Sequence, residues 1–257
     1  MAESVRLFRT QDHPCGYYAD RTANNLVLDP EEPRLAQVFE QALEHGFPRR
    51  RPHLSPRVPR LRACVATRIA ADRFEASRRH QRVWAQNQDL RVEIEPAHES
   101  EQHLSLYQRY LSGCHAGAGM DDGDPEGFSR FLLSTWADTV FINHYLGDDL
   151  VAIAVTDCTP NALSAIYTFY APSTPNEASG SLAILQQIEY ARRTSRPYLY
   201  LGFWINGHPK MHYKAEFRLE LRNALGKWTA FENPISPRAA RVPTPETNDS
   251  VANQSSD

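Results

Sequence analysis

Lysine, cysteine and long apolar runs are all scarce in this chain of 257 residues. No stretch approaches 18 consecutive apolar residues, and the start MAESVRLFRT lacks the apolar segment of a signal peptide, so we expect a cytoplasmic protein. The four cysteines lie far apart without a CxxC pair, which predicts neither a disulfide framework nor a complete zinc site. The content of hydrophobic residues, 41%, excludes a wholly disordered chain. The length allows one large domain or two small ones.

The net charge of −3 hides a strong imbalance along the chain. The stretch from Arg49 to Arg82 contains eleven arginines and two acidic residues, a local charge of +9 that leaves −12 elsewhere. Guanidinium groups pair bidentately with phosphate, so this stretch favours the docking of a nucleic acid. The alternative is a solvated basic face. The candidate residues for binding nucleic-acid phosphates are Arg49, Arg50, Arg78, Arg79 and Arg82.

Proline and glycine divide the first half of the chain. Residues 1–29 are polar and irregular, and Asp29 with Pro30 predicts the start of a helix that Gly46 ends. Four prolines make residues 47–64 a basic loop. A short strand over 65–69 and a basic helix over 77–88 follow.

The second half shows a regular order of helices and strands. Helices are expected over 99–111 and from Pro125, where Asp124 is the cap. Short turns separate three apolar strands and predict an antiparallel meander. A helix over 181–193 and an aromatic strand over 197–204 come next. The three meander strands are expected over 139–146, 150–158 and 163–170.

A meander followed by a helix and a strand is typical of an α+β protein with an N-acetyltransferase-like (GNAT) core. We expect three parts in the chain. They are a basic N-terminal subdomain containing cysteines over residues 1–98, a GNAT-like transferase domain over 99–231 and a disordered tail over 232–257.

Eight segments between residues 6 and 230 also form an ordered set of motifs. They are His13–Tyr17, Asp20–Ala23, Gly46–Arg50, Arg62–Cys64, His115–Met120, Ile166–Tyr170, Tyr198–Ile205 and Lys210–Phe217. In this order they resemble the aminoacyl-tRNA protein transferase family, specifically the bacterial aspartate/glutamate leucyltransferases related to eukaryotic arginyltransferases.

The resemblance implies an enzyme that transfers leucine from leucyl-tRNA to the N-terminal amine of proteins beginning with Asp or Glu. Such a product is an N-degron of the N-end rule pathway. The implied partners are aminoacyl-tRNA, with leucyl-tRNA first, and these proteins or peptides, with neither membrane nor DNA. Transfer of arginine is the alternative, because some relatives accept it. No cofactor is expected, since the aminoacyl ester is already activated and its aminolysis requires positioning and oxyanion stabilisation.

A cleft is expected where the third meander strand and the strand after the helix diverge. Tyr167, Tyr170, Tyr200 and Gly202 would border it, although tyrosine is also an ordinary strand former. Tyr167 and Tyr200 are catalytic candidates. His115 is another, because an imidazole can deprotonate the incoming ammonium; the alternative is a structural surface histidine.

The candidate substrate-binding residues combine lysines with a glycine-rich segment. Lys210 and Lys214 are two of only three lysines, and they share a face if their segment is an α-helix. One would hold the acidic side chain and the other the 3′ end of the tRNA. Gly117 and Gly119 permit close backbone approach to a ligand, and Met120 belongs to the same motif.

Cysteine usage departs from the family pattern. Relatives commonly carry CxxCxxC, whereas here Val58 and Leu61 precede Cys64, so we expect no metal and assign Cys15 and Cys64 a structural or redox-sensitive role. Two other functions compete. An acyl-CoA-dependent N-acetyltransferase would need a pyrophosphate-binding run that residues 177–181 do not provide, and a non-catalytic RNA-binding module would not account for the paired lysines.

Overall fold

The computed structural model of this protein describes the chain in segments. These are residues 5–18, 20–50, 53–54, 57–58, 64–114, 125–172, 176–223 and 225–231. The expected tail over 232–257 and the cap at Asp124 lie outside them.

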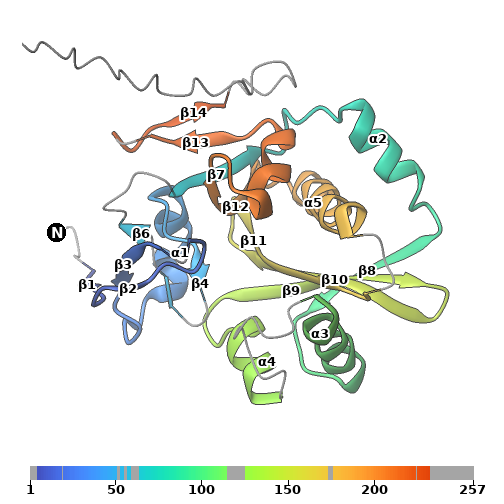
Figure 1. Ribbon diagram of the computed structural model, residues 1–257, viewed down its shortest axis with the longest axis horizontal. Coiled ribbons are helices and arrows are strands. Elements are labelled where there is room, and N and C mark those ends of the chain that lie inside the picture. Colours follow the sequence, from blue (N-terminus) through green and yellow to red (C-terminus); the bar gives the residue numbers. More distant parts are fainter. Residues whose placement is uncertain are drawn as a thin grey trace, which may run out of the picture.

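One large mixed sheet of eight strands forms the centre of the molecule (Figure 1). Neighbouring strands are antiparallel except β11 and β12, which are parallel. In spatial order the strands are β14 (Trp228–Ala230), β13 (Glu220–Arg222), β7 (Cys64–Ala70), β12 (Tyr198–Ile205), β11 (Ala162–Tyr170), β10 (Asp149–Cys158), β9 (Asp138–Leu146) and β8 (Leu90–Pro96).

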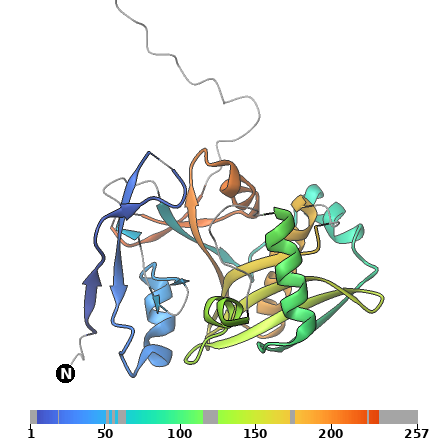
Figure 2. The ribbon, with the colours of Figure 1, turned by 60° about the horizontal axis from the view of Figure 1, so that its bottom comes forward.

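Helices cover both faces of this sheet. Helices α3 (Glu101–Cys114) and α4 (Pro125–Leu132) pack on one face, and α5 (Asn176–Arg193) lies on the other with α2 (Arg78–Ala85) beside it (Figure 2). The 3₁₀ segment η1 (Pro209–Phe217) follows β12 and folds back against it. Both faces of the central strands are therefore buried. Strand β10 accordingly has apolar residues at consecutive positions instead of an alternating pattern.

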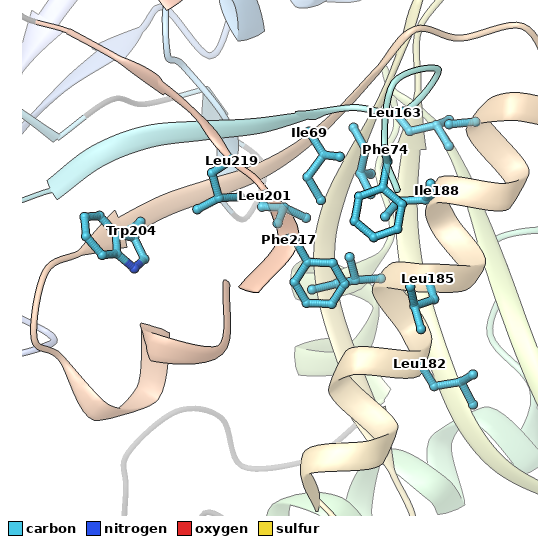
Figure 3. Close-up of a cluster of buried hydrophobic side chains, with 14 of the residues drawn as sticks. Ile69, Phe74, Leu163, Leu182, Leu185, Ile188, Leu201, Trp204, Phe217 and Leu219 are labelled. Atoms are coloured by element: carbon cyan, nitrogen blue, oxygen red, sulfur yellow. The ribbon is translucent and has the colours of Figure 1, made fainter. Parts of the chain in front are cut away.

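Hydrophobic side chains from five elements meet between α5 and the sheet. Figure 3 shows Leu182, Leu185 and Ile188 on one side of α5 facing side chains from β7, β11 and β12, and facing Phe217 at the end of η1. Phe217 is fully buried and stacks on Phe74 at 6.1 Å between ring centroids. This cluster therefore fixes the end of η1 against the helix side of the sheet.

The N-terminal residues form a smaller sheet beside helix α1 (Leu35–Glu44) (Figure 2). Its strand β3 (Thr22–Leu28) pairs with the three short strands β1 (Leu7–Arg9), β2 (His13–Pro14) and β6 (Arg57–Val58). Two more short strands, β4 (Arg49–Arg50) and β5 (His53–Leu54), pair with each other. The prediction that residues 1–29 are irregular is wrong for β1, β2 and β3, because the exposed β1 and the partly exposed β2 and β3 lack a clear apolar alternation.

Most predicted elements of the core are confirmed. The meander is β9, β10 and β11, and the aromatic strand is the central strand β12. The predicted basic helix is α2, which begins after the N-cap Ser77. The start of the first helix is wrong, because α1 begins at Leu35 and its N-cap Arg34 makes no side-chain cap. Asp29 instead accepts a hydrogen bond from the Glu31 amide in a turn.

The structure therefore confirms a mixed α/β protein with a large mixed sheet. Strands β7 and β8 belong to the first 98 residues and yet lie in the same sheet as β9–β12, so the predicted boundary near residue 98 divides one sheet. None of the helices within the described residues is long and apolar enough to cross a membrane.

Candidate functional site

Strands β11 and β12 separate within the sheet. Their parallel pairing covers three residues of each strand and ends at Ser164 opposite Tyr200. Strand β12 continues to Ile205 along β7, and β11 continues to Tyr170 along β10. The two strands thus diverge as expected, and we call the opening beyond Ser164 and Tyr200 the notch.

Gly202 sits at the mouth of the notch. The register of β12 against β7 shifts between Tyr200 and Gly202, and Gly202 has a φ of +71°. Among the described residues no atom lies within 4 Å of the position that a Cβ would take there. Glycine is therefore needed for the backbone angle, while the space beside it is open.

Lys214 brings a positive charge to this side of β12. Its Nζ donates to Leu201 O at 2.7 Å and to Phe203 O at 2.9 Å. The carbonyl between them, Gly202 O, is turned to β7 and accepts from Thr67 Oγ1 at 3.2 Å. The Lys214 ammonium therefore lies on the side of β12 that β11 has left.

Three tyrosines lie near one another, and one of them, Tyr213, stands next to Lys214 in η1. Burial, followed by the hydroxyls of Tyr17 and Tyr170, raises the pKa of Tyr213 to about 12. Tyr213 nevertheless exposes 36% of its surface. We call Tyr17, Tyr170 and Tyr213 the tyrosine wall.

His208 attaches the N-terminal part of the tyrosine wall to the sheet. The His208 ring contacts the rings of Tyr17 and Tyr18 edge to face, at 5.5 and 5.3 Å between centroids. Its Nε2 lies 3.3 Å from Tyr17 O. His208 is buried between β12 and η1. Tyr17 and His208 are 191 positions apart in the sequence and nevertheless form one surface.

Helix α3 supports the tyrosine wall from the other sheet face. The Tyr110 ring lies 5.0 Å from Tyr170 and 6.0 Å from Tyr167, both edge to face. Tyr167 also contacts Phe131 of α4 at 5.0 Å. Tyr170 and Tyr167 are both half-buried and both pack on α3, and Tyr167 packs on α4 as well. The catalytic role of Tyr167 stays a prediction.

The basic helix α2 is joined directly to η1. Arg79 donates to Glu216 Oε1 at 3.1 Å, and the His80 ring stacks on Phe217 at 4.5 Å. Arg78 and Arg82 are exposed, four residues apart on one helix face, and neither forms an ion pair within the described part of the chain. The exposed basic face of α2 is therefore adjacent to η1, the segment that carries Tyr213 and Lys214.

The predicted roles of two site residues are wrong, because both side chains are buried away from the notch. The Arg49 side chain has no exposed surface and binds Asp157 bidentately at 2.6 and 2.9 Å, so it cannot contact a phosphate. Tyr200 is 5% exposed, and its hydroxyl donates to Glu44 Oε2 at 2.7 Å and accepts from Arg68. Tyr200 faces α1 rather than the notch, which is incompatible with contact to a substrate there.

The condition under which Lys210 and Lys214 were predicted to share a helix face is not met. Their segment η1 is a 3₁₀ helix, in which residues three apart eclipse and residues four apart are about a third of a turn away from each other. Some predicted residues cannot be placed. His115, Gly117, Gly119 and Met120, and the side chains of Arg50 and Lys210, lie outside the described residues.

The sequence prediction missed Tyr17, Tyr213 and His208 as site residues. All three stand inside or next to the motifs that carried the resemblance, so their aromatic character was the available signal. Their convergence depends on contacts between the N-terminal segment and η1, which no local pattern encodes. Cys15 and Cys64 are half-buried.

The described residues line one further pocket at the opposite end of β10 and β11. It contains Phe39, Trp136, Cys158 and Arg196. Burial raises the pKa of the Cys158 thiol to about 11, so Cys158 is a weak nucleophile at neutral pH. The notch, with its cation and its tyrosines, is the stronger candidate site.

Comparison with known proteins identifies the family of the chain. Residues 13–82 match the family described as "Arginine-tRNA-protein transferase, N terminus", and residues 102–222 match "Arginine-tRNA-protein transferase, C terminus". Among solved structures, L-PGS from Bacillus licheniformis is similar over 65% of this chain and 58% of its own, with a TM-score of 0.41 and 11% identity.

Curated relatives match over nearly the whole chain. The aspartate/glutamate leucyltransferase of Stenotrophomonas maltophilia (strain K279a) is 44% identical over 92% of this chain and 97% of its own. The protein of that name from Xanthomonas campestris pv. campestris (strain B100) is 46% identical over 84% of this chain and 88% of its own. This chain therefore belongs to the aminoacyl-tRNA-protein transferase family and is an aminoacyltransferase.

Proposed function

We propose that this enzyme transfers leucine from leucyl-tRNA to the N-terminal amine of proteins that begin with Asp or Glu. The observation that carries the proposal is the notch, which combines a cation, a tyrosine wall and an adjacent exposed basic helix. The relatives named aspartate/glutamate leucyltransferase support the choice of leucine and of acidic N-termini. The products would act as N-degrons of the N-end rule pathway.

The arrangement of β9–β12 with α5 supports a GNAT-like reading of the core. In this reading the divergence of β11 and β12 opens the sheet so that an acyl donor and an amine approach each other between the strands. Where β11 no longer pairs with β12, the backbone carbonyls of β12 need another hydrogen-bond donor. Lys214 satisfies two of its carbonyls and leaves a charge at the place of reaction.

Catalysis in this site consists of positioning. The reaction joins the α-amine to the carbonyl carbon of the leucyl ester, releases the ribose hydroxyl of the tRNA and transfers one proton. An N-terminal amine has a pKa of about 7.7–8.0, so a fraction is neutral near pH 8. Bringing amine and ester together at a fixed angle lowers the barrier, and no metal is required for an activated ester.

The tyrosine wall and Lys214 divide the recognition of the two substrates. An Asp or Glu side chain entering the notch needs a cation, because an unpaired carboxylate in a crowded site is unfavourable. Lys214 supplies that charge at the strand edge. The leucyl group needs an apolar surface, and the rings of Tyr17, Tyr170 and Tyr213 provide one.

Helix α2 is proposed to bind the acceptor arm of the tRNA. Arg78 and Arg82 are exposed, and Arg79 lies beside them. The contacts of α2 with Glu216 and Phe217 hold this basic helix in a fixed position relative to the notch. A tRNA bound there places its 3′ end within reach of η1.

A transfer assay tests the proposed function. Purified enzyme is mixed with radiolabelled leucyl-tRNA or arginyl-tRNA and with four peptides that differ only in their first residue, Asp, Glu, Asn or Gln. We expect leucine on the Asp and Glu peptides only. Transfer of arginine instead would assign the alternative donor, and tRNA binding without transfer to any peptide would contradict the proposal in favour of an RNA-binding module.

A further inference from the structure

Three potential metal ligands meet where β8 passes into α3, away from the notch. Glu95 is the penultimate residue of β8, His98 lies in the connection, and His103 is in the first turn of α3. One coordinating atom from each lies within 4.8 Å of the other two. From this cluster we infer a binding site for one divalent transition-metal ion of the zinc type.

The hydrogen bonds of the two histidines fix which nitrogens remain for a ligand. His103 Nδ1 lies 3.0 Å from His98 O, and His98 Nδ1 lies 3.1 Å from Pro96 O. A carbonyl oxygen only accepts, so each Nδ1 carries the hydrogen. Each Nε2 then keeps its lone pair. A backbone carbonyl bound to the second ring nitrogen is also the usual support of a metal-binding histidine.

The contact between His103 and Glu95 is the second observation that points to a cation. His103 Nε2 lies 3.4 Å from Glu95 Oε1, so a nitrogen lone pair faces a carboxylate oxygen. Two acceptors in this arrangement need a positive charge between them. A tetrahedral site with zinc bonds of about 2.0–2.2 Å places two ligand atoms about 3.4 Å apart, which agrees with the spacing.

Neighbouring side chains hold the partly exposed Glu95 and the buried His103 in place. Asn143 is fully buried in β9 and donates from Nδ2 to Glu95 Oε1 at 2.6 Å. The His103 ring is 3% exposed and packs edge to face on Phe141 at 5.1 Å. Ser100 Oγ accepts from the His103 amide at 3.2 Å. Only His98 is exposed, so it can turn the short distance that coordination requires.

Two histidines and one glutamate are a donor set that zinc uses, with water in the fourth position. The site joins the edge strand β8 to α3, and α3 carries Tyr110 against the tyrosine wall. Bound metal would therefore fix the start of the helix that supports the notch. The sequence analysis predicted no metal, on the ground that the cysteines form no complete site, and none of the cysteines takes part here.

Metal titration of the full-length enzyme tests the site. The chelator-treated protein is titrated with Zn²⁺ by calorimetry and with Co²⁺ by absorption. We expect one ion per chain, a tetrahedral cobalt spectrum without a thiolate charge-transfer band, and a higher unfolding temperature with Zn²⁺. His98→Ala and Glu95→Gln should each weaken binding at least about tenfold, since each removes a ligand charge or lone pair.

Two variants separate loss of metal binding from loss of the fold and from nonspecific effects. Glu95→Gln retains an acceptor for Asn143, so the fold should survive the loss of charge. His45→Ala is the matched control, because His45 is also exposed and also hydrogen-bonds a carbonyl through Nδ1. The inference is overturned if the parent binds no Zn²⁺, which would leave a proton between His103 and Glu95. It is equally overturned if both ligand variants bind as the parent does or if cobalt shows thiolate coordination.

Discussion

Lys214 is the residue to which the proposed function assigns recognition of an acidic N-terminus. Its ammonium has a fixed position, because two carbonyls of β12 hold it. A fixed cation discriminates carboxylate from carboxamide better than a mobile one, since the charge need not be ordered when the substrate binds. Arginine fills nearly every other cationic position, so the small ammonium is suited to two adjacent carbonyls.

Replacement of Lys214 tests this role. Lys214→Met should lower the rate of leucyl transfer to an Asp peptide at least about tenfold and reduce the preference for Asp over Asn, because the charge-assisted pair is removed. Initial rates with both peptides measure it. Lys227→Met, an exposed lysine near the β13–β14 turn, is the matched control and should behave as the parent.

Binding of leucyl-tRNA to Lys214→Met should be nearly unchanged, which separates loss of recognition from loss of fold. If Lys214→Met retains full rate and full discrimination, the acidic side chain is bound elsewhere. Arg21 and Arg218 would then be the next cations to test.

At the scale of elements, arginines that are clustered along the chain do not all lie on one exposed surface, and α2 is the part that does. The stretch from Arg49 to Arg82 predicted one basic surface. Arg49 is buried against Asp157, and Arg68 is buried between Glu44 and Glu220. Charge clustering along the chain cannot reveal a partner 108 residues away. Within the described part of this stretch, Arg73 is exposed but ion-paired with Glu220, and the exposed face of α2 carries Arg78 and Arg82 for phosphate.

Removing that face should weaken tRNA binding in a salt-dependent way. Arg78→Ala with Arg82→Ala should lower the slope of log affinity against log salt by up to about one unit for each phosphate that is no longer neutralised. Binding of leucyl-tRNA at several salt concentrations measures the slope. Arg130→Ala, an exposed arginine on α4, should leave it unchanged. An equal slope in parent and double variant would exclude α2 as the tRNA site.

The success of sequence-based prediction also varied by element. The meander was predictable because apolar strands alternate with short turns such as Gly147-Asp148. Strand β8 was missed although its burial alternates, and β13 and β14 are too short to show a pattern. The notch was predictable from the order of β11, α5 and β12. The tyrosine wall was not, since it depends on the N-terminal segment packing on η1.

Across the whole molecule, buried histidines make stability depend on pH. Burial lowers the pKa of His144 from 6.5 to about 4, and burial also lowers the pKa of His80. The unfolded chain therefore binds more protons than the folded chain below pH 6.5. Stability is complete above that pH and falls as the pH decreases toward 4.

His144 alone should lower the free energy of unfolding by about 2 kcal/mol between pH 7 and pH 5. Denaturant unfolding at both values measures the change. His144→Leu should reduce the difference by about that amount, because leucine takes up no proton, whereas the exposed His45→Leu should not. The same pH dependence in the parent and in His144→Leu would refute this assignment.

The proposed function requires the amine and the ester to meet in the notch between β11 and β12. Photo-cross-linking can locate this meeting point, using an Asp-initiated peptide with a photoreactive group at its second residue and mass spectrometry to map the attachment. We expect attachment at or beside Tyr17, Tyr170 and Tyr213, competed by unlabelled Asp peptide and not by Asn peptide. Competed attachment around Trp136 and Cys158, at the opposite end of the strands, would show that the reaction takes place elsewhere.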